Sequence, residues 1–415
     1  LFLFLFWSIF MQWHLFFRSE QVAIHFFDIA QFLNFLIAFS VIIFLVLNID
    51  KVKMNKVLLF YFSFTIISLI CNIAFANPNY IFLLYWIIFS ILVPLSCLVA
   101  YSEYEIKIDK LFYFLYQIHK YIILIIILII LYFAGPLGLD ILPKAFYNDR
   151  VYNIMMHSSE LTSGLLHENW FSKHAIGWCF LFVALYSYYH KNSLIIPIII
   201  ILFLLMNRSL LLGLLCTGFV FFFYSDINRL TKLLIAILFL LITFIIFILL
   251  NDIILEYITS DSRWTLYSLL PHIIIDFPFG LGLGTFHLEE TNQMLTQKYA
   301  DLLFLVNYVM AGGGNISLGY YISPATESNL VLFIADQGIL YLLFTLIFLL
   351  KIYHFLILNW KIIEKTDKLI LVYFMILFFA SIGEDIAYEW FYWIIFGLTI
   401  GVYFKYINKY QNQNP

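Results

Sequence analysis

The chain has 415 residues, of which 64% are hydrophobic and only 11% are charged. Soluble domains carry about 25% charged residues, so this composition excludes an ordinary soluble domain and predicts an integral membrane protein. The formal net charge of -3 points to no charged partner, and we expect no nucleic-acid binding. The four cysteines have no CxxC spacing, which favours small buried side chains over disulfides or a metal site.

Apolar runs of about 17 to 25 residues predict transmembrane helices. The first run, residues 1–17, is interpreted as a span because it lacks the flanks of a cleavable signal peptide. The expected fold is an all-α polytopic membrane protein with about twelve transmembrane helices. The spans are expected near 1–17, 28–48, 56–75, 80–101, 120–138, 174–190, 193–206, 209–225, 233–250, 328–350, 368–386 and 390–407.

Two long polar stretches interrupt this pattern and divide the chain into five parts. These are N-terminal transmembrane helices (1–138), a first outer loop (139–173), central transmembrane helices (174–250), a large outer loop (251–327) and C-terminal transmembrane helices (328–415). Most lysines fall in the remaining loops, so the positive-inside rule predicts that both termini are cytoplasmic.

The arginines are distributed between the two predicted sides of the membrane differently from the lysines. Of the arginines only Arg229 falls on the predicted inner side, whereas Arg150, Arg208 and Arg263 fall on the outer side. A guanidinium fork suits bidentate contact with phosphate oxygens, although an outer arginine can equally pair with lipid headgroups or loop carboxylates. Arg208 lies between two apolar runs, where a charge normally faces a cavity or a partner.

The large outer loop ends on a carboxylate, Glu327, directly before the apolar run 328–350. Earlier in this loop, the composition of 264–277 predicts a surface helix that Pro278 stops. Gly280, Gly282 and Gly284 then predict a tight backbone turn. Glu327 can act as a general base on an acceptor hydroxyl, or it can simply cap the helix that follows.

Several of these segments resemble motifs of the bacterial O-antigen ligase and polymerase superfamily. The stretch 206–213 is similar to its S-R-G-aliphatic motif, with Asn207 and Ser209 in place of the usual small residues. Arg263 followed by 278–286 resembles its arginine and P-x-G-x-G-x-G-x-F block. The stretches 167–169 and 327–340 resemble its Asn-containing segment and the block that opens its next helix.

The resemblance covers about residues 150–350 in the same order, and it implies an enzyme that uses undecaprenyl-diphosphate-linked glycans on the periplasmic face. It implies that Arg208 and Arg263, with Arg150, bind the diphosphate and that Glu327 activates the acceptor hydroxyl. Further sugar or acceptor contacts are expected from His167, Asn169 and Asn329. Neither a metal nor another cofactor is expected, and a polysaccharide chain-length regulator is an expected membrane partner.

Glu327 itself favours one branch of the superfamily. Ligases that join glycan to the lipid A core carry a histidine at this position, whereas polymerases vary there. We therefore expect an O-antigen polymerase, a metal-independent glycosyltransferase of the bacterial inner membrane that takes part in lipopolysaccharide or related polysaccharide biosynthesis. An O-antigen ligase or a protein O-oligosaccharyltransferase is the alternative within the superfamily, and a lipid-linked sugar flippase is the alternative of another class.

Overall fold

The computed structural model describes eleven stretches of the chain together with residues 78, 228, 237 and 241. All regular structure in these stretches is helical, and none of it is strand, which confirms the all-α prediction. The expected residues Arg150, His167, Asn169 and Glu327 lie outside the described residues. The described stretches are 39–51, 55–76, 80–103, 108–121, 176–190, 208–225, 230–235, 262–285, 289–302, 329–382 and 390–413.

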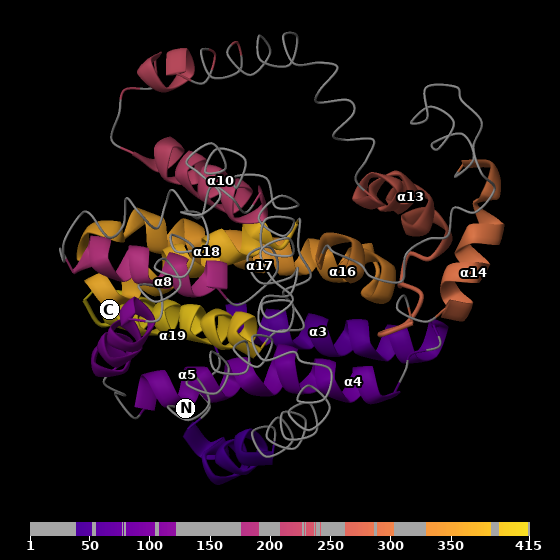
Figure 1. Cartoon of the computed structure of the whole chain (residues 1–415). Helices are drawn as coiled ribbons and strands as arrows, with labels where there is room; N and C mark the ends of the chain where they lie inside the picture. Colours follow the sequence, from indigo (N-terminus) through magenta and orange to yellow (C-terminus); the bar gives the residue numbers. More distant parts are fainter. Residues whose placement is uncertain are drawn as a thin grey trace, which may run out of the picture.

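The main helices run in chain order as follows, and Figure 1 labels the α-helices among them. They are α3 (Lys56–Phe75), α4 (Tyr80–Ile87), the π-helix η3 (Ile88–Leu92), α5 (Val93–Glu103), α8 (Ile176–Tyr189), α10 (Arg208–Tyr224), α13 (Ser262–Asp276), α14 (Glu289–Lys298), α16 (Asn329–Gln337), α17 (Ile339–Leu358), α18 (Lys365–Ala380) and α19 (Trp390–Gln413). Residues 39–47 and 108–121 are also helical, and short 3-10 turns lie at Ile49–Lys51 (η2) and Trp360–Ile362 (η6).

Two helices of the described part, α3 and α17, are long and apolar enough to cross a membrane by length and composition. They pack together, with the rings of Tyr61 and Phe348 stacked at 4.5 Å between centroids. Their outer faces expose large apolar side chains, among them Ile66 and Ile70 on α3 and Leu343 and Leu350 on α17. Apolar faces of this kind mark interaction surfaces, and lipid hydrocarbon would cover them.

Two predicted spans contain a break in the regular helix. The run 80–101 is helical throughout but includes the π-turn η3, just before Pro94. Proline lacks an N–H, and its ring clashes with the carbonyl four residues earlier in a helix. For Pro94 that carbonyl belongs to Ser90, and it accepts a hydrogen bond from the Tyr61 hydroxyl at 3.3 Å.

The second span, the run 328–350, is divided at Gly338 into α16 and α17, and α17 continues to Leu358.

One helix lies where the sequence predicted a connection. Residues 108–121 are helical, although the nearest expected span began at residue 120. Their apolar side chains recur at helical spacing and pack on α8, where the Phe112 and Phe182 rings lie 5.3 Å apart and the Tyr116 and Tyr186 rings 4.6 Å apart. The charges of Asp109 and Lys110 hid this pattern from a search for uncharged runs.

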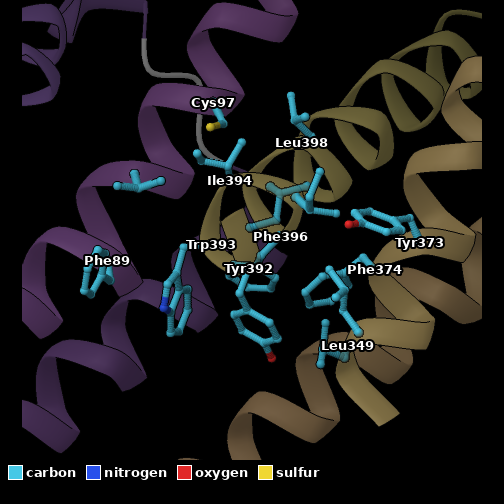
Figure 2. Packing of buried hydrophobic residues seen from close by; sticks show 14 of the residues in the cluster. Phe89, Cys97, Leu349, Tyr373, Phe374, Tyr392, Trp393, Ile394, Phe396 and Leu398 are labelled. Carbon is cyan, nitrogen blue, oxygen red and sulfur yellow. The ribbon is translucent and has the colours of Figure 1, made fainter. Parts of the chain in front are cut away.

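The core is built around α18 and α19, which pack against each other and against α5, α8 and α10. Figure 2 shows its aromatic part, where Tyr392 and Phe396 of α19 lie against Phe374 of α18. The Phe374 and Phe396 ring centroids are 5.3 Å apart. Because α18 is buried along most of its length, it serves as the central element against which the other helices are positioned.

Close approach of α19 to α5 depends on Gly397. A Cβ atom there would lie 2.7 Å from the Cys97 Cβ and 2.8 Å from the Pro94 Cα. We therefore expect Gly397→Ala to force the two helices apart and to lower the free energy of unfolding by about 1–3 kcal/mol. Thermal unfolding in detergent would measure this. Gly218→Ala is the control, since a Cβ at Gly218 would meet nothing within 4 Å, and an equal loss in both variants would contradict the packing argument.

One end of the bundle is rich in lysine, and we call it the lysine end. Here the end of α5, the start of α18 and the end of α19 meet around Asp367, which pairs with Lys405 at 2.9 Å and accepts hydrogen bonds from the hydroxyls of Tyr406 and Tyr101. Lys405 also pairs with Glu364. The lysine end lies at the left of Figure 1, around the C-terminus.

Candidate functional site

At the opposite end, α13 is followed by a turn that contains the predicted glycines. Residues 278–285, which we call the glycine turn, follow the end of α13 at Asp276. Gly280, Gly282 and Gly284 have φ angles of 86°, 121° and 73°. Side chains rarely tolerate this left-handed region, so the expectation of a tight glycine-dependent turn is confirmed.

The glycine turn interlocks with the break between α16 and α17. Gly338 at this break also has a positive φ, 84°. A Cβ at Gly280 would lie 2.4 Å from the Asp336 carbonyl oxygen, and a Cβ at Gly338 would lie 2.3 Å from the Pro278 carbonyl oxygen. Only glycine allows two backbones to approach this closely, which explains why both segments carry one.

Asn72, on the last turns of α3, links this pair of segments to a third. Its Nδ2 donates to the Asp336 carbonyl at 2.6 Å, and its Oδ1 accepts from the Leu283 N–H at 3.0 Å. The Asp336 side chain accepts from the Gly284 N–H at 3.0 Å through Oδ2. Asn72 and Asp336 are both fully buried. We call these two side chains, with the glycine turn and Gly338, the buried joint.

The buried joint follows from the physical chemistry of polar groups in apolar surroundings. An unpaired amide or carboxylate away from water is costly, whereas a hydrogen-bonded one is tolerated. A backbone N–H that bonds a carboxylate also makes one of the stronger hydrogen bonds in proteins. The joint therefore binds the end of α3, the glycine turn and the end of α16 into one unit.

The starts of α10 and α13 lie at this same end of the bundle. α10 packs on α18. Near the start of α10, a Cβ at Gly213 would lie 2.5 Å from the carbonyl oxygen of Ile376, which is near the end of α18. Near the end of α10, the Phe221 ring lies 4.8 Å from the ring of Trp360, which precedes α18. α10 therefore runs antiparallel to α18. α13 reaches the end of α18 as well, since the Tyr267 hydroxyl donates to the Ile382 carbonyl at 2.6 Å.

The predicted arginines occupy the first turns of these two helices. Arg208 is the first residue of α10, and Arg263 is the second residue of α13. The structure thus brings both helix starts to the end of α18. Asn329 is the first residue of α16, and α16 packs against α13. Because backbone N–H groups at a helix start favour anions, this end of the bundle has two helix starts suited to negative charge.

A surface ion pair fastens α14 beside the glycine turn. Lys298 pairs with Asp276 at 2.9 Å and lies over the Phe277 ring at 4.4 Å, and the Tyr299 hydroxyl donates to Asp276 at 2.8 Å. Hydrogen bonds from Lys298 and then Tyr299 lower the pKa of Asp276 below its usual value, so the pair persists at neutral pH. It is a structural contact between α13 and α14.

Among the side chains that the structure describes, no group of three or more His, Cys, Asp or Glu residues is placed to hold a metal ion. The chain matches no family model, no curated protein and no solved structure.

Sequence reasoning missed the part played by Asn72 and gave no role to Asp336. A signal for both was present, because an amide and a carboxyl group are strongly polar and each lies inside an apolar run. Strongly polar groups in such runs usually mark a functional or packing constraint. The sequence could not tell which partners they would find.

Proposed function

We propose that this chain is a multi-pass glycosyltransferase of the bacterial inner membrane that polymerises undecaprenyl-diphosphate-linked oligosaccharide repeat units into O-antigen or a related surface polysaccharide. The observation that carries the proposal is the convergence of two arginine-bearing helix starts, α10 at Arg208 and α13 at Arg263, on one end of α18. A diphosphate carries the negative charge that such helix starts and guanidinium groups favour.

The proposed orientation places the lysine end in the cytoplasm and the glycine turn on the periplasmic side. Lys361, Lys365, Lys368 and Lys405 belong to elements that meet at the lysine end, and loops rich in lysine remain cytoplasmic in most membrane proteins. The arginines at the other end would then meet a lipid-linked donor whose diphosphate lies at the periplasmic surface.

In the proposed reaction, a hydroxyl of the acceptor sugar attacks the anomeric carbon of the lipid-linked glycan. The new glycosidic C–O bond forms while the C–O bond to the diphosphate breaks, and undecaprenyl diphosphate leaves with the bonding electron pair. Arg208 and Arg263, with Arg150, stabilise the charge that develops on the diphosphate. Glu327 takes the proton of the acceptor hydroxyl, and His167, Asn169 and Asn329 contact sugar or acceptor.

The test is a glycan ladder from bacterial cells that lack this gene and carry either the wild-type gene or Glu327→Gln. We expect the wild type to restore the ladder and Glu327→Gln to leave a single repeat unit on the lipid A core, because the amide is not basic enough to take the proton. Asp276→Asn makes the same chemical change at a structural carboxylate in the same loop, and it should retain the ladder.

Other outcomes would redirect the proposal. If no repeat unit reaches the core without this gene, the failing step is ligation or export, which favours an O-antigen ligase or a lipid-linked sugar flippase. Loss of glycan from proteins with an intact ladder would favour a protein O-oligosaccharyltransferase. A normal ladder with Glu327→Gln would remove Glu327 as the base and leave the rest of the proposal in place.

A further inference from the structure

We propose that Asn72 and Asp336 are positioning residues, which hold the break between α16 and α17 open and thereby fix the start of α16 relative to α13. This inference rests on the proposed function, because the start of α16 is where Asn329 lies and Glu327 precedes it by two residues. Neither Asn72 nor Asp336 belongs to the site residues that the sequence predicts.

The hydrogen bonds at the end of α16 carry the argument. In a continuous helix, each backbone carbonyl accepts from the N–H four residues later. At the break, the Ala335 carbonyl instead accepts from the Leu281 N–H at 2.6 Å, and the Asp336 carbonyl accepts from the Asn72 Nδ2 at 2.6 Å. The glycine turn and α3 thus supply the donors that the interrupted helix loses, as a helix end in apolar surroundings requires.

The side chain of Asn72 is chemically specific for this task. An amide can donate and accept at once, and Asn72 does both, toward Asp336 on α16 and Leu283 in the glycine turn. Leucine has a similar volume but neither function. Without the Asn72 donor, the Asp336 carbonyl gains most by rejoining α16 and α17 into one regular helix, which removes the break at Gly338.

Such a change would move the start of α16. This helix has nine residues, so at a rise of about 1.5 Å per residue it is about 13 Å long. A change of about 20° in its direction at Gly338 would displace its first residue by about 4–5 Å. A misplacement of about 1 Å in a catalytic group can lower a rate about 10²-fold, so the joint would control turnover without touching the substrate.

The test compares Asn72→Leu with Thr65→Val in the full-length protein in membranes. Thr65 lies on the same helix and is also buried, but its hydroxyl donates to the Tyr61 carbonyl one turn away on α3 itself. Thr65→Val therefore controls for loss of a buried polar group. A cysteine at the buried position Leu283, in a chain whose four native cysteines are replaced, reports on the joint through its labelling by a membrane-impermeant maleimide.

With an intact joint, Leu283→Cys should resist labelling. Asn72→Leu should raise the labelling rate at least about tenfold and lower kcat for repeat-unit transfer by about 10- to 100-fold, with KM for the lipid-linked unit little changed. Thr65→Val should alter neither quantity. Asp336→Asn retains an oxygen that can accept the Gly284 N–H, so it should keep more activity than Asp336→Ala.

Three results would overturn the proposal. Unchanged labelling in Asn72→Leu would mean that Asn72 does not hold the glycine turn. Raised labelling with normal kcat would mean that the joint only stabilises the fold. A fall in kcat of equal size in Thr65→Val would mean that the loss of any buried polar group is enough to lower kcat. If Asn72→Leu fails to accumulate, Asn72→Ser, which is too short to bridge both partners, takes its place.

The two proposals fail in different ways. A wild-type protein that transfers no repeat unit would remove the proposed function, while the labelling comparison would still decide whether Asn72 holds the joint. A wild type that transfers repeat units, together with variants that label freely and turn over normally, would remove only the positioning role.

Discussion

Arg208→Ala and Arg263→Ala should each lower repeat-unit transfer by about 10²–10³-fold, while the protein still inserts into the membrane at the wild-type level. Each change removes a fixed positive charge from the proposed diphosphate site, and the loss of one preorganised donor to a developing charge typically has this effect. The measurement is transfer from a lipid-linked repeat unit in membranes, normalised to protein amount, together with the glycan ladder in cells.

Lysine variants make this prediction sharper. Arg208→Lys and Arg263→Lys keep the charge but lose the planar fork that binds two phosphate oxygens at once, so they should fall between the wild type and alanine. Arg229→Ala is the control, because the positive-inside rule predicts that Arg229 lies on the cytoplasmic side. Normal polymerisation by both alanine variants, or an equal loss in Arg229→Ala, would show that the diphosphate does not bind at the starts of α10 and α13.

Gly338→Ala and Gly280→Ala are expected to lower the free energy of unfolding by about 3 kcal/mol or more. A side chain at a positive φ costs about 1–2 kcal/mol, and forcing an atom into a packed region adds about 1–3 kcal/mol. At both positions the obstacle is backbone, with a carbonyl oxygen 2.3–2.4 Å from the added Cβ, so a rotamer change cannot relieve it. Thermal unfolding in detergent would measure the loss.

The glycine variants also separate strain from helix propensity. Gly218→Ala lies in a regular helix with open space around its Cβ, and alanine favours a helix over glycine by up to about 1 kcal/mol. This variant should be as stable as the wild type or slightly more so. Wild-type stability in Gly338→Ala would contradict the close approach of the glycine turn to the α16–α17 break.

Much of the helical architecture could be predicted from local sequence. The run 56–75 predicted α3 with its bounds, and the composition of 264–277 predicted most of α13. Predictions failed where one or two residues interrupted the local pattern. Gly338 divided an otherwise uniform apolar run, and the charges around 109–110 concealed a helix whose other face is apolar.

For the site, the sequence identified the residue types and the structure decided their neighbours. The glycine turn was predicted because three alternate glycines have few other uses. Its partner was not, because a glycine at 338 can serve a kink, a packing contact or a helix end. Only the close approach of the Asp336 and Pro278 carbonyls to these glycines distinguishes these uses.

The sequence alone determined that this is an apolar, helical chain, where most of its helices lie, and which residues are chemically suited to hold phosphate or take a proton. These properties depend on composition and local periodicity, which the order of residues contains directly. Only the tertiary structure decided that Asn72 meets Asp336, 264 positions later in the chain, and that the starts of α10 and α13 share one end of α18. Such contacts depend on how whole helices pack, and a periodic pattern specifies the buried face of a helix but not the helix that covers it.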